Sequence, residues 1–119
     1  QRFIKEVAVT RRVLCISAPL PTISDGQKWG DVANFRKSIK ASQRERTDLT
    51  LKFNQQMHEF CSDNGINYAS LDAQCMGDDG FVKSCLINTE KTDHHYDPDN
   101  YSRVLIDAIS VYLRPDLIN

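Results

Sequence analysis

Two adjacent histidines beside an acid form the stretch of this chain whose residue types most readily do chemistry. Asp93, His94 and His95 lie within the run from Thr92 to Tyr101, directly ahead of a predicted helix start. A histidine can gain or lose a proton near neutral pH, and a carboxylate can fix which ring nitrogen carries that proton. Loops at helix starts often carry function, because a rigid scaffold holds them while their polar groups stay accessible. The stretch therefore indicates acid and base chemistry, with Asp93 as the nearest acid in sequence.

The same histidines admit two other interpretations. A metal site would combine them with side chains of the preceding loop, namely Cys75, Asp78, Asp79 and Cys85. Adjacent histidines seldom face one ion, and the cysteine spacing matches no common zinc pattern, so we expect neither a metal nor a cofactor. Alternatively, both histidines are solvated or packing residues at a helix entrance, which is a commoner arrangement than a catalytic pair.

The composition predicts one soluble domain without a polyanionic partner. The chain has 119 residues and a formal net charge of -1, so it fits a single domain and gives no reason to expect nucleic acid or an anionic membrane. No apolar run approaches the roughly 18 residues that span a bilayer, and the N-terminus lacks the order of a signal peptide. The four cysteines form no Cys-x-x-Cys pair. Their pattern favours a reducing, cytoplasmic compartment, although a bridge between Cys75 and Cys85 stays possible.

The first elements that must position the histidines follow from hydrophobic periodicity. Val13–Ala18 is an almost continuous apolar run that ends at Pro19, which is typical of a strand buried on both faces of a parallel sheet. Thr22–Gly30 is rich in turn residues and predicts a long exposed loop. A helix should follow, with three apolar residues on one face: Val32, Phe35 and Ile39.

A second helix and strand are predicted next. Thr47 or Asp48 should cap the helix, and Asn64-Gly65 should close it before a strand over Ile66–Asp72. Its apolar stripe is expected to be core: Leu49, Phe53, Met57, Phe60 and Cys61. Basic side chains crowd the region before and at its start, and we expect them to form a solvated face: Arg36, Lys37, Lys40, Arg44 and Arg46.

The last helix is the clearest prediction. Asp97 should cap it, Pro98 should take the first helical position, and Pro115 should stop it, while Phe81–Ile87 forms a short helix or strand beforehand. Alternating helices and strands imply parallel strands with helices on both faces, a three-layer α/β/α fold of flavodoxin-like type. Ligands of such sheets collect at the carboxyl ends of the strands, so the histidine-bearing loop should share that rim with the loops that follow the two strands.

These residues resemble a known family. The stretch from Asp93 through His95 to Tyr101, leading into an amphipathic C-terminal helix, is similar to the last conserved block of SGNH (GDSL-like) hydrolases, which normally reads Asp-x-x-His. The resemblance covers about the whole chain, since Val13–Pro21 looks like a core strand of that fold and Leu49–Asp72 looks like the helix and strand after it. It departs in one respect, because Asp93 stands two residues before His95 and not three.

The resemblance implies a serine esterase, acyl hydrolase or acyltransferase that acts on an ester of a small molecule or glycan. His95 would be the base, Asp93 its orienting acid, and His94 the alternative base. The family's Gly-Asp-Ser block and its oxyanion residues do not occur here, and Ser17 and Ser24 sit in no nucleophile elbow. Residues 1–119 would then be the C-terminal part of a larger SGNH-like domain, with the nucleophile upstream. The competing hypothesis is a non-catalytic α/β ligand-binding or interaction domain.

Overall fold

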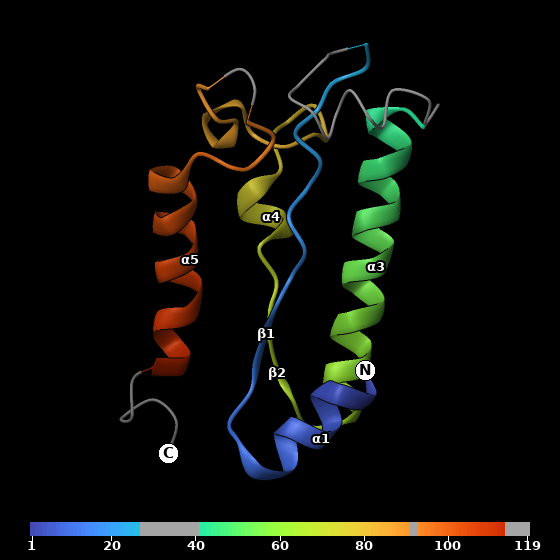
Figure 1. The fold of residues 1–119 in the computed structure, drawn as a ribbon, viewed down its shortest axis with the longest axis vertical. Helices are drawn as coiled ribbons and strands as arrows, with labels where there is room; N and C mark the ends of the chain where they lie inside the picture. The colour runs from blue at the N-terminus through green and yellow to red at the C-terminus, as the bar shows by residue number, and fades with distance from the viewer. Residues whose placement is uncertain (27–40, 91–92, 114–119) are drawn as a thin grey trace.

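The computed structural model describes residues 1–26, 41–90 and 93–113, which form a mixed helix and strand fold (Figure 1). Its elements are α1 (Arg2–Thr10), β1 (Leu14–Ile16), α3 (Gln43–Asp63), β2 (Asn67–Ala69), α4 (Asp72–Cys75), a 3-10 turn η1 (Ser84–Leu86) and α5 (Pro98–Leu113). The predicted helix that carries Val32, Phe35 and Ile39 lies outside the described residues, as do Arg36, Lys37, Lys40 and Pro115. Among the described residues, no helix is both long and apolar enough to cross a membrane.

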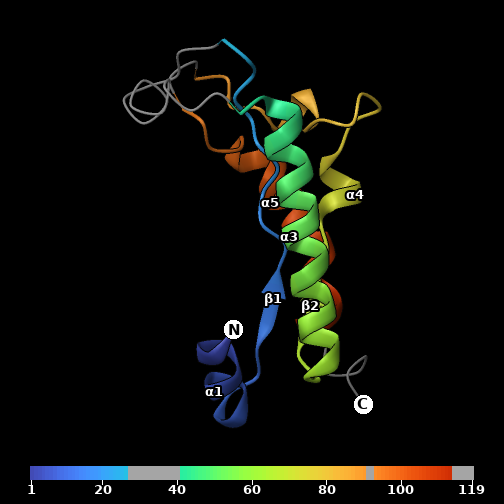
Figure 2. The same ribbon diagram turned by 90° about the vertical axis from the view of Figure 1, so that its right-hand side faces the viewer.

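The two strands pair in parallel, which confirms the predicted α/β character. Leu14 lies opposite Asn67 and Ile16 opposite Ala69, and α3 is the crossover between the strands. α3 and α5 lie on opposite sides of the strand pair (Figures 1 and 2). The prediction that the first strand is buried on both faces is wrong for the described residues, because Leu14 and Cys15 are half-buried and Ile16 is 38% exposed. In that part of the chain β1 has a partner strand on one edge only.

A capping box starts α3 earlier than the sequence analysis predicts. The Ser42 hydroxyl accepts from the Glu45 N–H at 3.1 Å, and the Glu45 carboxylate accepts from the Ser42 N–H at 2.8 Å. This reciprocal pair satisfies two donors at the helix start. The cap at Thr47 or Asp48 is therefore wrong, and Thr47 is fully buried within the helix. The predicted closure is confirmed, with Gly65 in the left-handed region at φ 64°.

The buried face of α3 is polar where the sequence analysis predicts an apolar core. Leu49 is 68% exposed and Phe53 is 50% exposed, so the prediction of core positions is wrong for these two residues of the stripe. Cys61 is fully buried, in agreement with the prediction, but it shares its face with Thr47 and Asn54. For Asn54 the reason lies in the loop after β1, because its amide satisfies the covered N–H and carbonyl of Ala18.

The two arginines of α3 that the structure describes differ in exposure: Arg44 is exposed, as the expected solvated face requires, whereas Arg46 is half-buried, and both make specific contacts. The Arg44 guanidinium lies 4.1 Å from the Phe81 ring centroid and donates to the Asp79 carbonyl at 3.0 Å. Arg46 donates to the Ile23 carbonyl at 2.7 Å. Both side chains thus join α3 to loops at the carboxyl end of the strands.

The start of α5 follows the prediction. The Asp97 carboxylate accepts from the Asn100 N–H at 2.9 Å, and Pro98 is the first helical residue. The helix packs through half-buried side chains against a small core of six buried residues: Leu20, Leu71, Cys75, Val82, Leu86 and Tyr96. The predicted short element over 81–87 is η1, and all four cysteines are free, so no bridge joins Cys75 to Cys85.

Candidate functional site

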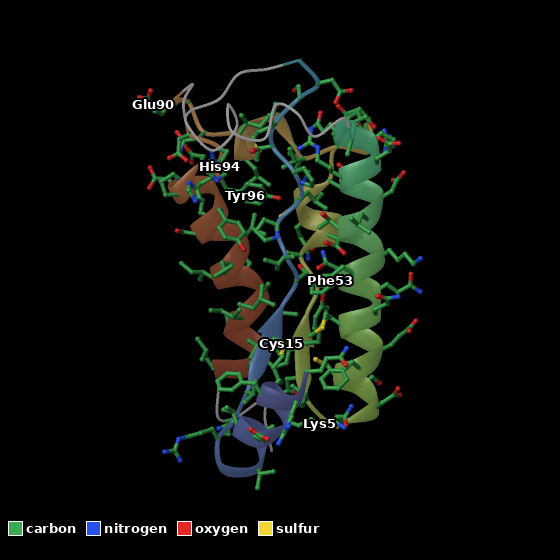
Figure 3. The ribbon with its side chains drawn as sticks, turned by 45° about the vertical axis from the view of Figure 1, so that its right-hand side comes forward. Lys5, Cys15, Phe53, Glu90, His94 and Tyr96 are labelled. Atoms are coloured by element: carbon green, nitrogen blue, oxygen red, sulfur yellow. The ribbon has the colours of Figure 1, made fainter. Side chains whose placement is uncertain are left out.

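The histidine loop, defined as Asp93 to Tyr96, is fastened to the chain segment that leaves β1. The Leu20 N–H donates to the Tyr96 hydroxyl at 2.6 Å, and the Thr22 hydroxyl donates to the His94 carbonyl at 2.6 Å. Figure 3 shows His94 and Tyr96 at the end of the molecule toward which the chain runs after β1. The predicted meeting of the histidine loop with the loop after the first strand is therefore confirmed.

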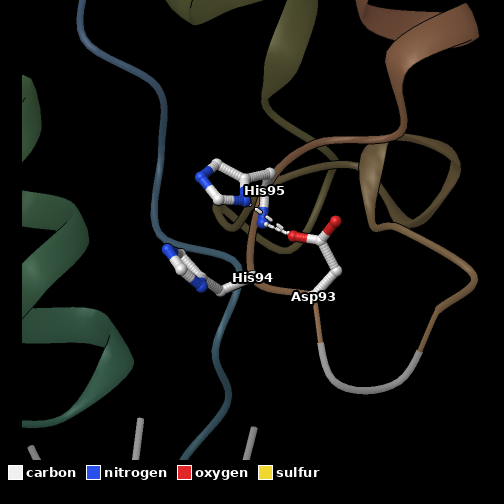
Figure 4. Close-up of side chains that lie close together, drawn as sticks. All are labelled: Asp93, His94 and His95. Carbon is white, nitrogen blue, oxygen red and sulfur yellow. Dashed lines mark hydrogen bonds and ion pairs between the residues drawn. The ribbon is translucent and has the colours of Figure 1, made fainter. Parts of the chain in front are cut away.

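Asp93 and His95 form a short contact. The Asp93 carboxylate oxygen Oδ1 lies 2.7 Å from His95 Nδ1, and the same oxygen accepts from the His95 backbone N–H at 2.9 Å (Figure 4). The bonds from the His95 backbone and ring lower the pKa of Asp93, so the carboxylate stays ionised below the usual pH range for an aspartate. An ionised carboxylate only accepts, so in a neutral His95 ring Nδ1 carries the proton and Nε2 is left to accept one.

The two histidines differ in their surroundings. The His95 side chain is 75% exposed, and its ring is held by Asp93. His94 instead lies against that ring in a tilted arrangement, with centroids 4.3 Å apart and planes inclined by 31°. Its backbone carbonyl is the atom that Thr22 holds. His95 is thus the histidine that has an acid to orient it, in agreement with its predicted role as the base.

A groove of about 720 Å³ opens beside the histidine loop. Its walls are mainly apolar and come from the segment after β1 and from α3 and α5: Pro19, Leu20, Ile23, Leu49, Pro98 and Tyr101, with His94 and His95 at one side. Two hydroxyls of the wall are already engaged, since Thr22 donates to His94 and Thr50 donates to the Arg46 carbonyl at 2.9 Å. No hydrogen bond of the described residues joins the His95 ring to a hydroxyl.

Ser17 has a structural role, as predicted. Its side chain is 5% exposed, and its hydroxyl accepts from the Leu71 N–H at 2.9 Å. It therefore joins the end of β1 to the chain that leaves β2. Its hydroxyl is thus occupied in holding the two loops together.

Asn54 is a site-supporting residue that the sequence analysis misses. Its side chain is 1% exposed, accepts from the Ala18 N–H at 2.8 Å and donates to the Ala18 carbonyl at 3.0 Å. It also donates to the Asp72 carboxylate at 2.8 Å. One amide therefore joins the loops after both strands. The available signal was its spacing of seven residues from Cys61, which places both on one face of α3.

The metal site with Cys75, Asp78, Asp79 and Cys85 is not assembled. Cys75 lies in the core at 3% exposure, and the Asp79 carboxylate accepts from the Phe81 N–H at 2.9 Å. A different set of potential metal ligands lies close together in the structure. One donor atom from each of Asp93, His94 and His95 lies within 4.8 Å of the other two. The two adjacent histidines thus lie on the same side of their loop, contrary to the expectation for neighbouring residues.

Asp72 predicts a measurable pH dependence of stability. Burial raises the pKa of Asp72, against a smaller opposing effect of the Asn54 amide. The native state therefore binds this proton more tightly than the unfolded chain, and the stability that it provides is lost as pH rises from about 4 through the folded-state pKa. We expect Asp72→Asn, whose amide oxygen can still accept from Asn54, to become more stable relative to the parent as pH rises from 3 to 7. Urea unfolding across this range measures the difference, and Asp48→Asn, at an exposed acid of α3, is the control for a change of the same chemistry at the surface.

Comparisons of the chain with protein-family models, with curated proteins and with solved structures found no match. The residues of the histidine loop and their geometry are therefore the evidence on function.

Proposed function

We propose that this chain supplies the base and the acid of a serine-dependent ester hydrolase or acyltransferase of the SGNH type. His95 Nε2 takes the proton of a serine hydroxyl that lies outside these 119 residues. The serine oxygen then bonds to the ester carbonyl carbon, the alcohol leaves with the proton from His95, and water releases the acyl group by the same route. Asp93 holds the ring and stabilises the imidazolium.

The observation that carries the proposal is the 2.7 Å contact between Asp93 Oδ1 and His95 Nδ1. The Asp-x-His spacing departs from the Asp-x-x-His of SGNH hydrolases, which raises the question whether the carboxylate can reach the ring. It reaches the ring because Asp93 forms a local turn, in which its oxygen also accepts from the His95 N–H at 2.9 Å. The shorter spacing is thus compatible with an oriented base.

We propose that the complete domain is a three-layer α/β/α domain of SGNH type, and that residues 1–119 are its C-terminal part. The parallel strand pair with α3 and α5 on opposite sides is compatible with such an arrangement. The remainder of the domain would cover exposed large apolar side chains of β1 and α3, since exposed apolar surface often marks an interaction surface: Ile16, Leu49 and Phe53. An ester of a small molecule or of a glycan is the substrate class that the resemblance implies.

A non-catalytic α/β binding domain is the second candidate. Two observations favour it, namely the 75% exposure of the His95 side chain and the turn that Asp93 makes with the His95 N–H, which aspartates form in loops without any catalytic role. In that case the groove beside the loop would hold a ligand without reaction.

Labelling by a fluorophosphonate probe separates the two candidates, because such probes react with serines that a histidine activates. We expect the natural full-length protein to become labelled on one serine, and His95→Ala to abolish this labelling. His58→Ala is the matched control, since His58 lies on α3 and stacks on Tyr68 with centroids 4.9 Å apart. A full-length protein that stays unlabelled would favour the binding domain, and equal labelling of the His95 variant would remove His95 from the mechanism.

A further inference from the structure

We propose that Asp93, His94 and His95 together bind one divalent transition-metal ion, with Zn²⁺ as the representative. This binding does not depend on the proposed hydrolase activity. It rests on the geometry, donor types and accessibility of three consecutive side chains.

The three donor atoms are close to the separation that an ion requires. They lie within 4.8 Å of one another, whereas tetrahedral Zn²⁺ with bonds of about 2.0 to 2.1 Å holds its ligand atoms roughly 3.3 Å apart. The difference between these two separations is about 1.5 Å, so no pair of donor atoms has to approach by more than that for the ion to bind. The His94 and His95 rings already lie close together, with centroids 4.3 Å apart, and Figure 4 shows the Asp93 carboxylate bonded to His95.

The backbone of the loop is fixed before any ion binds. The Thr22 hydroxyl holds the His94 carbonyl at 2.6 Å, and the Asp93 carboxylate holds the His95 N–H at 2.9 Å. The next residue, Tyr96, is 8% exposed and bonds to the Leu20 N–H. Because the backbone is already ordered, binding has to restrict only side-chain rotations, which lowers its entropic cost.

The donor set selects the class of ion. Two imidazoles and one carboxylate suit Zn²⁺, Cu²⁺, Ni²⁺ and Fe²⁺, whereas Mg²⁺ and Ca²⁺ prefer oxygen ligands throughout. Three protein ligands also leave a coordination position for water or for a small anionic ligand. This position would face the groove, since His94 and His95 both line it.

Metal binding and base catalysis exclude each other at His95. An ion that takes a ring nitrogen of His95 and an oxygen of Asp93 disrupts the contact on which the proposed hydrolase depends. Zn²⁺ should therefore inhibit ester hydrolysis, and this consequence, unlike the binding itself, rests on the proposed function.

The test is titration of the protein with ZnCl₂ alone, followed by calorimetry and by NMR of the imidazole nitrogens. The protein carries Cys85→Ser, because Cys85 is an exposed thiol that could bind zinc independently. We expect one equivalent to bind, with shifts in the rings of His94 and His95 and none in His58. His94→Asn should weaken binding by at least about tenfold, the loss that even a supporting residue of a metal site commonly causes. Asp93→Asn and His95→Asn should do the same.

His94→Asn is the decisive variant, because it removes a metal ligand and keeps the Asp93 to His95 contact. It should lose zinc affinity without losing the thermal transition of the fold. His58→Asn is the matched control and should bind zinc as the parent does. Unchanged affinity of His94→Asn, equal weakening in His58→Asn, or the absence of binding at millimolar zinc would each overturn the metal site. Hydrolysis without zinc is measured separately, so a failure of the metal site is distinguishable from a failure of the proposed hydrolase.

Discussion

His95→Ala should lower kcat for p-nitrophenyl acetate hydrolysis by the full-length protein about 10³-fold or more, the order of loss seen when the base of a serine triad is removed. The physical reason is that no other described side chain has a ring oriented by a carboxylate, as the 2.7 Å contact from Asp93 orients His95. The KM should change much less, because the ring acts on the proton of the nucleophile and not on substrate binding. Initial rates over a range of substrate concentrations separate the two constants.

Two further variants make this prediction specific. His94→Ala should keep most of the rate, because the His94 ring lies against His95 and Asp93 orients the His95 ring, not the His94 ring. Asp93→Asn should lose a large part of it, since an amide can hold the ring in the wrong tautomer. If His94→Ala lost the activity and His95→Ala kept it, the two histidines would exchange roles. Equal activity of the parent protein and of all three variants would exclude the histidine loop from catalysis.

Asn54→Ala should lower the free energy of unfolding by about 3 kcal/mol, the second large effect that we expect. The Asn54 side chain is 1% exposed and makes three hydrogen bonds, to both backbone groups of Ala18 and to the Asp72 carboxylate. Truncation leaves the N–H and carbonyl of Ala18 and the carboxylate of Asp72 without their partner. A fully buried polar group that loses its partner costs roughly 1 to 3 kcal/mol, and these groups are partly buried. It also creates a small cavity between the loops.

Urea unfolding followed by circular dichroism measures this loss. Gln55→Ala is the matched control, because Gln55 is the next residue of α3, is exposed, and donates an exposed hydrogen bond to Glu59 at 3.3 Å. We expect that variant to stay within about 0.5 kcal/mol of the parent. A loss below about 1 kcal/mol for Asn54→Ala would show that water replaces the amide, and that Asn54 does not hold the two loops together.

The sequence alone determined the elements whose signals are local. The cap at Asp97, the Pro98 start of α5, the closure at Gly65 and the strand at Leu14–Ile16 each depend on residues within a few positions of one another. Parallel pairing followed from the alternation of helices and strands. The start of α3 was missed although its signal is equally local, because the Ser42 and Glu45 pair stands ahead of the apolar residues on which the prediction was based.

The tertiary structure decided which side chains meet. Asn54 is buried and Leu49 is exposed, although polarity suggests the reverse, because the backbone of distant loops has to be satisfied on that face of α3. Thr22 and His94 are 72 positions apart, and no local pattern relates them. The distance of Asp93 to His95 also lay beyond the sequence, since the spacing of two residues allows contact or separation. The turn that Asp93 makes, on a loop fixed by Thr22 and Tyr96, is what brings the carboxylate to the ring.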